Sequence, residues 1–516
     1  MPFPVSRFFY GSLVALMLFA SRGFAAESLL VTNAHLIPVD PAQPASYLGY
    51  MLVDRGGRIA AIGAGEAPAT LKADRVMDAG GRFVAPGFLS AHSHIYMSPL
   101  RGLGHDQTLY GWFRAWDRLL RHSTADDVYW FTLHGSLDFL RNGITTAYDF
   151  TYGGVVGPPA IGAGETVAGP RLKEGPFEEN QLKAKADAGL RFVNSVSLPP
   201  FGTRAEIKAR FGRLVAHANE RWGKNPLYLK MAISGAVQFQ PTRETALLEA
   251  EVMKEYGVLN QAHFLESPER VAEQQVKFNW YLESGALGPN FIFGHFIQTT
   301  PEIVKIAAAA GASMSWQPTS NSRLASGVAD IVAYRKAGMK VAVGLDDQSC
   351  TDISDPFQNL RIGMALIRTH YKSAAALSVT EMLRLHTLGS AEVLGIADQV
   401  GTLTVGKWAD FLVVDPRLPD TGPLHDPVAT YVLACGLRNL QQVYVGGVKV
   451  ADGLTMTTAD ERTVRREVDT RIAKLEAIAR EEERKTAGSG RPHPFAPARL
   501  VPFPATPATP TAGAGQ

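Results

Sequence analysis

The sequence predicts an α/β protein: a (β/α)8 barrel of the TIM type, with a discontinuous small β-sandwich domain formed by both flanks of the barrel. The chain has 516 residues, 46% of them hydrophobic, which is enough for one large barrel and an accessory domain. Short apolar segments alternate with helix-like segments over residues 87–395. Segments typical of β-strands, separated by Gly and Asp, lie on either side of this region.

The middle region supplies the barrel. Apolar runs predict strands at 143–148, 190–196, 227–233, 259–263, 290–295, 312–316 and 341–346. Between them lie segments with helical character, among them 126–142, 204–222 and 243–257. Repeated strand–helix units over some 300 residues favour a parallel barrel.

The flanks supply the sandwich, with residues 26–86 as its first part and 396–456 as its second. Gly56 and Gly57 predict a hairpin turn between two short strands in the first part. The second part contains similar short strands separated by Gly and Asp turns. We therefore expect the two flanks to meet in space as one domain, with the barrel inserted between them.

Both ends of the chain differ in character from the rest. Residues 1–25 resemble a cleaved signal peptide, with Arg7 before an apolar stretch and small residues at Gly23 and Ala25. Residues 457–485 are highly charged and predict an exposed helix, and 486–516 predict a disordered tail rich in Pro, Ala and Thr. The expectation is an exported protein, periplasmic in a Gram-negative source, with no membrane segment after signal removal.

Composition excludes several classes of function. Lys plus Arg number 51 and Asp plus Glu 49, so no basic excess points to nucleic acid. The two cysteines, Cys350 and Cys435, are too few for a disulfide framework or a cysteine-rich zinc site. Any metal must therefore be held by histidines and carboxylates, and we expect a small molecule as the partner.

Potential metal ligands recur at the ends of predicted strands. His92 and His94 are two residues apart, so on a strand both side chains project to the same side. His263, His295 and Asp346 each end a predicted strand further along the chain. Barrel active sites are built at the carboxyl ends of the strands. The recurrence predicts that these side chains meet, with Glu266 close by.

Several motifs resemble the amidohydrolase superfamily, most closely its cytosine-deaminase, guanine-deaminase and triazine-chlorohydrolase branch. The resemblance runs from about 28 to 455, and the motifs occur in the same order. The matching segments are 84–94, which ends in His-Ser-His, 139–147, 263–266, 318–327, 343–346, 389–395 and 401–415. The resemblance implies a barrel with a composite β-sandwich and a metal-dependent hydrolase. Homo-oligomers are common in that superfamily, which leaves a homo-oligomer open.

The resemblance also implies roles for individual residues. His92, His94, His263 and Asp346 would bind one divalent metal, zinc or iron(II). Glu266 would be the acid and base, His295 would face the substrate's developing charge, and Asp346 would receive a proton from the water. The implied reaction is attack of a metal-activated water on an electron-poor C=N or C=O carbon, which releases ammonia, an amine or another leaving group.

Three alternatives remain open from the sequence. Lys230 lies on the predicted fourth barrel strand, in a stretch that also resembles the carboxylated-lysine strand of two-metal amidases and dipeptidases. In that case His295 and Lys230 would join the ligand set. A less favoured alternative is an inactive binding protein on the same fold. Contacts of Asp347, Trp112 and Cys350 with substrate also stay open, although Asp347 is expected to point away or cap a helix.

Overall fold

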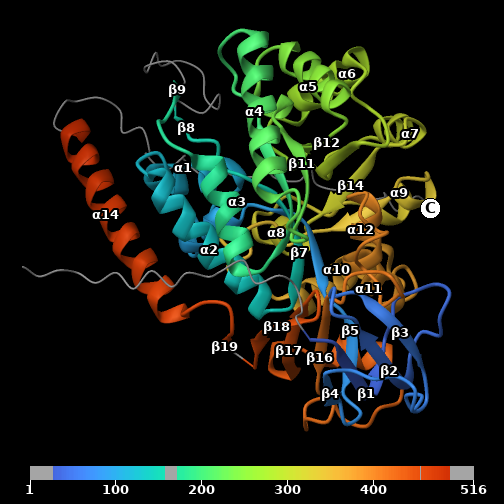
Figure 1. The fold of residues 1–516 in the computed structure, drawn as a ribbon. Coiled ribbons are helices and arrows are strands. Elements are labelled where there is room, and N and C mark those ends of the chain that lie inside the picture. Colours follow the sequence, from blue (N-terminus) through green and yellow to red (C-terminus); the bar gives the residue numbers. More distant parts are fainter. Residues whose placement is uncertain (1–26, 157–170, 454, 488–516) are drawn as a thin grey trace, which may run out of the picture.

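The computed structural model of the chain describes residues 27–156, 171–453 and 455–487 (Figure 1). The predicted signal peptide at 1–25 lies outside the described residues, as does the predicted tail from residue 488 onward. The middle of the chain forms an eight-stranded sheet with helices around it, and the two flanks meet beside it in a second sheet.

The eight-stranded sheet has the order β6-β7-β10-β11-β12-β13-β14-β15, and every neighbouring pair is parallel. This confirms the predicted barrel. Its strands are buried along nearly their whole length, which is typical of parallel sheets covered on both faces. They are β6 (Phe88–Ser93), β7 (Ile144–Phe150), β10 (Arg191–Ser197), β11 (Tyr228–Gly235), β12 (Leu259–Phe264), β13 (Phe291–His295), β14 (Ser313–Trp316) and β15 (Val341–Val343).

The last strand returns to the first at the end of the strands that holds the histidines. The backbone N–H of Asp346 donates to the carbonyl of His92 at 2.9 Å, and that of Leu345 donates to the hydroxyl of Ser90 at 3.0 Å. The contact that closes the barrel therefore also places Asp346 beside the first histidine pair.

Helices follow most of the barrel strands and bury an apolar face against them. Capping boxes fix where three of them begin, with Thr124 before α2, Thr203 before α4 and Ser378 before α11. The helices of the barrel region are α1 (Leu109–Leu120), α2 (Ala125–Arg141), α3 (Phe177–Ala188), α4 (Arg204–Trp222), α5 (Glu244–Tyr256), α6 (Val271–Ser284), α7 (Pro301–Ala309), α8 (Pro318–Arg323), α9 (Ile331–Lys336), α10 (Pro356–Tyr371), α11 (Val379–Arg384) and α12 (Ser390–Val393).

The flanks form one domain because β5 and β16 pair antiparallel, with Pro86 opposite Phe411. The strands of this sheet are β1 (Leu29–Leu36), β2 (Tyr47–Val53), β3 (Ile59–Ala64), β4 (Arg75–Asp78), β5 (Phe83–Pro86), β16 (Phe411–Val414), β17 (Leu440–Val445), β18 (Val448–Asp452) and β19 (Thr455–Met456). A two-stranded sheet, β8 (Val155–Val156) with β9 (Arg171–Leu172), and the short helix α13 (Pro427–Ala429) lie outside both large sheets.

The strands of the flanks are joined into one continuous mixed sheet rather than two separate ones. The join exists because β1 pairs with β2, β4 and β5 at once. The sheet still encloses a core of its own. Gly57, in the turn between β2 and β3, lies against Gly446 in the turn after β17, and side chains of β1, β2, β5, β16 and β17 form one buried cluster.

The C-terminal helix α14 (Glu461–Ala487) crosses the outside of α1 and α2 (Figure 1). A helix is present as predicted, but the expectation that it is simply exposed is wrong. Val464, Val468, Leu475 and Ala479 are buried, because they form an apolar stripe on one side of an otherwise charged helix. Within the described residues, no helix has both the length and the apolar character needed to cross a membrane.

Candidate metal centre

The predicted ligands meet at the carboxyl ends of the barrel strands. His92 lies on β6, His94 directly follows it, His263 lies on β12, and Asp346 follows β15. The side chains of His92 and Asp346 are buried, whereas those of His94 and His263 are partly exposed to a cavity above them. The structure therefore brings together the four residues that the family resemblance named as ligands and that the strand-end positions had grouped with His295.

The distances between ligand atoms fit one ion. The Nε2 atom of His263 lies 3.1 Å from Nε2 of His92 and 3.0 Å from Nε2 of His94. Oδ1 of Asp346 lies 3.7 Å from Nε2 of both His92 and His94. Ligands about 2.0–2.1 Å from a tetrahedral zinc ion are roughly 3.3 Å apart, so one ion fits between these four atoms.

Hydrogen bonding fixes the protonation of His92. The amide nitrogen of Gln261 donates to the carbonyl of Ala91 at 2.9 Å, which leaves its Oε1 atom 2.5 Å from Nδ1 of His92. Because an amide oxygen only accepts, Nδ1 carries the hydrogen and Nε2 presents a lone pair to the other histidines. A cation among these nitrogens satisfies that arrangement, and a carbonyl-type partner behind the ring is usual for metal-binding histidines.

Electrostatics also favour neutral imidazoles. Burial lowers the pKa of His263 to about 4 and lowers the pKa values of His92 and His94 well below the usual value. For His92 and His94, the neighbouring histidines lower the pKa further, because a second positive charge would be repelled. Histidine binds a metal in its neutral form, so the site is prepared for a cation.

The fourth ligand is held from two sides. The hydroxyl of Ser320 donates to Oδ2 of Asp346 at 2.6 Å, and the backbone of Asp346 is fixed to His92 in the barrel closure. Asp346 and His295 both have left-handed backbone torsions, with φ of 67° and 65°. Such torsions are uncommon outside glycine and concentrate at functional sites.

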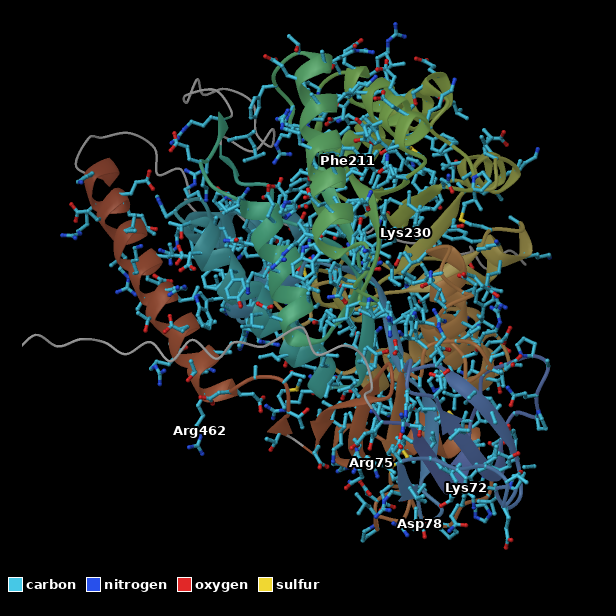
Figure 2. The ribbon with its side chains drawn as sticks, in the orientation of Figure 1. Lys72, Arg75, Asp78, Phe211, Lys230 and Arg462 are labelled. Carbon is cyan, nitrogen blue, oxygen red and sulfur yellow. The ribbon has the colours of Figure 1, made fainter. Side chains whose placement is uncertain are left out.

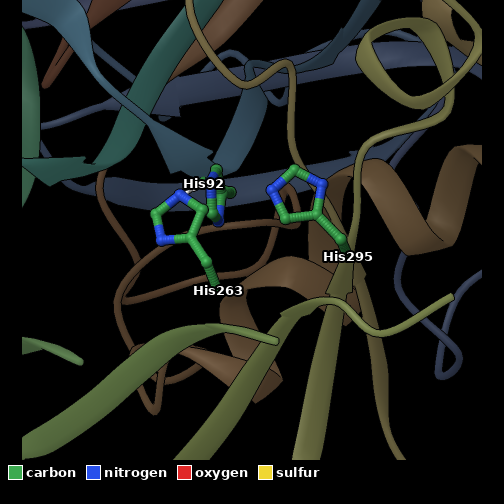
Figure 3. Close-up of side chains that lie close together, drawn as sticks. All are labelled: His92, His263 and His295. Carbon is green, nitrogen blue, oxygen red and sulfur yellow. Dashed lines mark hydrogen bonds between the residues drawn. The ribbon is translucent and has the colours of Figure 1, made fainter. Parts of the chain in front are cut away.

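His295, the last residue of β13, lies beside the ligands His92 and His263 (Figure 3). The amide nitrogen of Asn321 donates to Nδ1 of His295 at 2.8 Å, so its Nε2 atom carries the hydrogen. Nε2 lies 3.5 Å from Oε2 of Glu266 and 3.9 Å from Oδ2 of Asp346. His295 is therefore placed as a hydrogen-bond donor at the edge of the site.

Glu266 is a buried carboxyl group that forms no salt bridge with any Lys or Arg in the described part of the chain. Only 2% of the residue is exposed. Burial, and then the charges of Asp346, Asp347 and Glu269, raise its pKa well above the usual value. Both effects favour the protonated carboxyl, which is the form that can donate a proton.

The bridging role considered for Lys230 is wrong. Lys230 is the third residue of β11, and its Nζ atom donates to the carbonyls of Leu394 and Gly395 at 3.0 and 2.8 Å (Figure 2). The strand reaches the cavity at Ser234, four residues later, which corresponds to about 13 Å along a strand. Lys230 therefore lies at the wrong end of its strand to bridge two metals.

The remaining residues that the sequence singled out surround the site. Trp112 and Cys350 line the cavity above the metal ligands. Oδ1 of Asp347 accepts the backbone N–H groups of Ser349 and Cys350, at 2.6 and 2.9 Å, so this carboxylate caps the turn that follows it. Gln261 was not predicted from the sequence. It precedes His263 by two residues on one strand, and this spacing points both side chains the same way.

A second buried group that sequence reasoning overlooked lies behind His94. Asp149, on β7, accepts the backbone N–H of Ile95 at 3.0 Å and forms an ion pair with Lys185 of α3. Both charged side chains are fully buried, and Lys185 also donates to Asn194 at 2.6 Å. No sequence motif indicates this pair, because the two residues belong to different secondary-structure elements.

A sequence model of the amidohydrolase family matches residues 83–450. The chain belongs to that family. The match covers the barrel together with β5 and the strands that return to it, so it includes every ligand described above. The family establishes the predicted class of enzyme, a metal-dependent hydrolase that uses a divalent metal and acts on small molecules.

Curated relatives resemble the chain over nearly their whole length. A 5-methylthioadenosine/S-adenosylhomocysteine deaminase of Desulforudis audaxviator is 27% identical over 463 residues, which is 87% of this chain and 99% of the relative. A protein of the same name from Bacillus cereus is 26% identical over 442 residues, 84% of this chain and 96% of the relative.

Solved structures support the fold. A zinc-bound adenosine deaminase from Xanthomonas campestris superposes with a TM-score of 0.73 at 22% identity, covering 87% of this chain and 98% of that protein. A zinc-bound atrazine chlorohydrolase from Arthrobacter aurescens gives 0.72 at 20% identity, covering 86% of this chain and 100% of that protein.

Proposed function

We propose that this protein hydrolytically removes an amino group, or another leaving group such as chloride, from a nitrogen heterocycle, with one zinc or iron(II) ion. The observation that carries the proposal is a four-ligand site for one ion with the buried carboxyl of Glu266 and the imidazole of His295 beside it. The names of the relatives, which are deaminases and a chlorohydrolase, support the same chemistry.

Each residue has a role in this proposal. His92, His94, His263 and Asp346 would hold the ion, which when bound lowers the pKa of a coordinated water toward about 7. Oδ2 of Asp346 would accept the proton that the attacking water loses. Glu266 would donate its proton to a ring nitrogen next to the carbon under attack, so that the ring accepts the incoming electron pair. The proton held by Asp346 would then pass to the amino group, which departs as ammonia.

His295 would act on charge that develops during the reaction. Its hydrogen on Nε2 points to the edge of the site that Glu266 and Asp346 share. A fixed N–H donor in a site shielded from water stabilises an oxyanion without having to reorient. Asn321 keeps the hydrogen on Nε2 by donating to the other ring nitrogen.

The proposal is tested by turnover and metal content together. Zinc- or iron-loaded protein is assayed for release of ammonia from aminopurines, adenine nucleosides and cytosine, and of chloride from chlorotriazines. The variant Glu266→Gln should retain one metal per chain and lose at least about 100-fold in kcat, since the proton donor is gone. Unchanged turnover in this variant, or no turnover of any of these compounds, would contradict the proposed chemistry.

We also propose that the protein is exported, with cleavage after Ala25 and a periplasmic location. The support is the apolar stretch at 8–20 that follows Arg7 and ends before small residues. Sequencing the N-terminus of protein recovered from the periplasmic fraction tests this. Finding Met1 on cytoplasmic protein would contradict it.

A further inference from the structure

A cavity of about 220 Å³ lies above the metal ligands, between helix α1 and the ends of the barrel strands. Its walls are dominated by aromatic side chains, which we call the aromatic wall: Trp112, Phe113, Trp116, Phe150, Tyr152 and Phe239. Half of these lie on one face of α1, so the helix forms a roof over the site.

The aromatic wall is continuous from the roof to the ligands. On α1, Trp116 lies 5.9 Å from Trp112 and 5.4 Å from Phe113, measured between ring centroids. Phe113 then contacts Phe239 across the cavity at 5.8 Å, and Phe239 lies 6.3 Å from the ring of His263. A flat ring bound above the ligands would therefore contact aromatic surfaces, which favours stacked or edge-to-face packing.

Charge is confined to the reacting end. Among the described residues that line the cavity, Glu266 and Asp346 are the acidic ones, and there is no Lys or Arg. Burial raises the pKa of Tyr152 well above its usual value, so this phenol is uncharged at neutral pH.

Lys173, a cation behind the aromatic wall, is already hydrogen-bonded to the backbone. Lys173 packs against the ring of Tyr152, with Nζ 5.0 Å from its centroid, but its ammonium group donates to the carbonyls of Leu120 and Ser123, both at 2.8 Å. It therefore faces the chain that follows α1 rather than the cavity. A charged substituent on a ligand would find no counter-ion among the described lining residues.

Hydroxyl groups at the base of the cavity are also mostly occupied. Thr151 donates to the carbonyl of Ser195 at 2.5 Å, and the hydroxyls of Ser195 and Ser234 are hydrogen-bonded at 2.7 Å. The hydroxyl of Tyr96 makes no hydrogen bond with the described residues, so it can form one with a polar atom of a ligand. The cavity thus offers stacking surface and little polarity.

Building on the proposed function, we propose that the substrate is an uncharged, planar nitrogen heterocycle with an apolar substituent, and that the aromatic wall selects against substituents that carry charge. A charged group moved from water into an apolar cavity without a partner is strongly destabilised. A neutral alkyl or thioether group in the same place gains from leaving water. Trp112, Phe113 and Trp116 would then determine specificity.

Two matched pairs of compounds test this inference. 5′-Methylthioadenosine and S-adenosylhomocysteine present the same adenine ring, but the first has a neutral tail and the second a zwitterionic one. A chlorotriazine with an N-ethyl group and its N-carboxymethyl counterpart form the second pair. We expect kcat/KM to be at least about 100-fold higher for the neutral member of whichever pair is turned over. Equal or better use of the charged member would overturn the inference while leaving the proposed function intact.

Binding separates failure of the inference from failure of the proposed function. If neither pair is turned over, the proposed function is judged on the wider set of compounds named above, and affinity for the neutral and charged members is compared with metal-loaded Glu266→Gln by calorimetry. Neutral compounds should bind at least about 10-fold more tightly, and equal affinity would overturn the inference. Trp116→Ala should weaken binding of the neutral compound, whereas Trp130→Phe, on α2 beside Arg471 and outside the cavity lining, should not.

Discussion

Replacing Lys185 with methionine should destabilise the protein by about 3–5 kcal/mol, because it leaves the carboxylate of Asp149 buried without its cation. Both side chains have no exposed surface, so water cannot take over the role of the ammonium group. The loss is measured as the free energy of unfolding in urea, followed by tryptophan fluorescence. Lys183→Met is the matched control.

The control lies two residues away on the same helix and also removes half of an ion pair. Lys183 and Asp187 are 53% and 32% exposed, and such a surface pair contributes about 0–1 kcal/mol. Equal losses for Lys185→Met and Lys183→Met would refute the argument from burial. Combining Lys185→Met with Asp149→Asn should recover part of the loss, since the stranded charge is removed while an amide oxygen still faces the N–H of Ile95.

The Lys185 variant should also affect the metal. Asp149 accepts the backbone N–H of Ile95, which directly follows the ligand His94. Displacing that carboxylate moves the segment that carries His94, so bound metal per chain should fall in the folded variant. Full metal occupancy in Lys185→Met would show that the ion pair stabilises the barrel without positioning the ligand.

Three further predictions follow from individual groups. Lys230→Met should leave metal content and turnover unchanged, because Lys230 only contacts backbone carbonyls at the far end of β11; loss of half the metal would restore the two-metal alternative. Burial raises the pKa of Glu249 to about 7, so the folded protein holds this proton up to that pH while the unfolded chain loses it near 4.5. Its contribution to stability should therefore fall by about 3 kcal/mol as pH rises from 4.5 to 7, and unfolding of Glu249→Gln should lack this component; parallel pH profiles would contradict it. Removing the metal with a chelator should abolish turnover and lower the melting temperature, and added zinc should restore both; turnover that survives chelation would contradict the site.

The candidate site could be predicted because parallel barrels bring the carboxyl ends of distant strands together. His92, His263 and Asp346 needed only a strand-end position to be grouped, and the structure groups them. Lys230 was misplaced because alternation along a strand predicts which face of the sheet a residue occupies, but not how far along the strand it lies from the active-site end. Its strand extends five residues beyond it, and the apolar run did not indicate this length.

Contacts between elements were beyond the sequence. The Lys185–Asp149 pair joins a helix to a neighbouring strand, and neither residue has a spacing that marks it. The buried face of α14 could have been predicted, since Val464, Val468, Leu475 and Ala479 recur at helical intervals. The many charged residues around them drew attention away from this pattern. This face is covered by α1 and α2, and the sequence of α14 alone does not indicate which helices pack against it.

The pairing of Pro86 with Phe411 has a consequence for how the chain matures. The early strands of the flanking sheet must wait for their partner strand until the whole barrel has left the ribosome. At 5–20 residues per second, those roughly 300 residues take about 15–60 s to synthesise. During that interval β5 has an unpaired edge, which a chaperone or the export machinery would have to shield from other nascent chains.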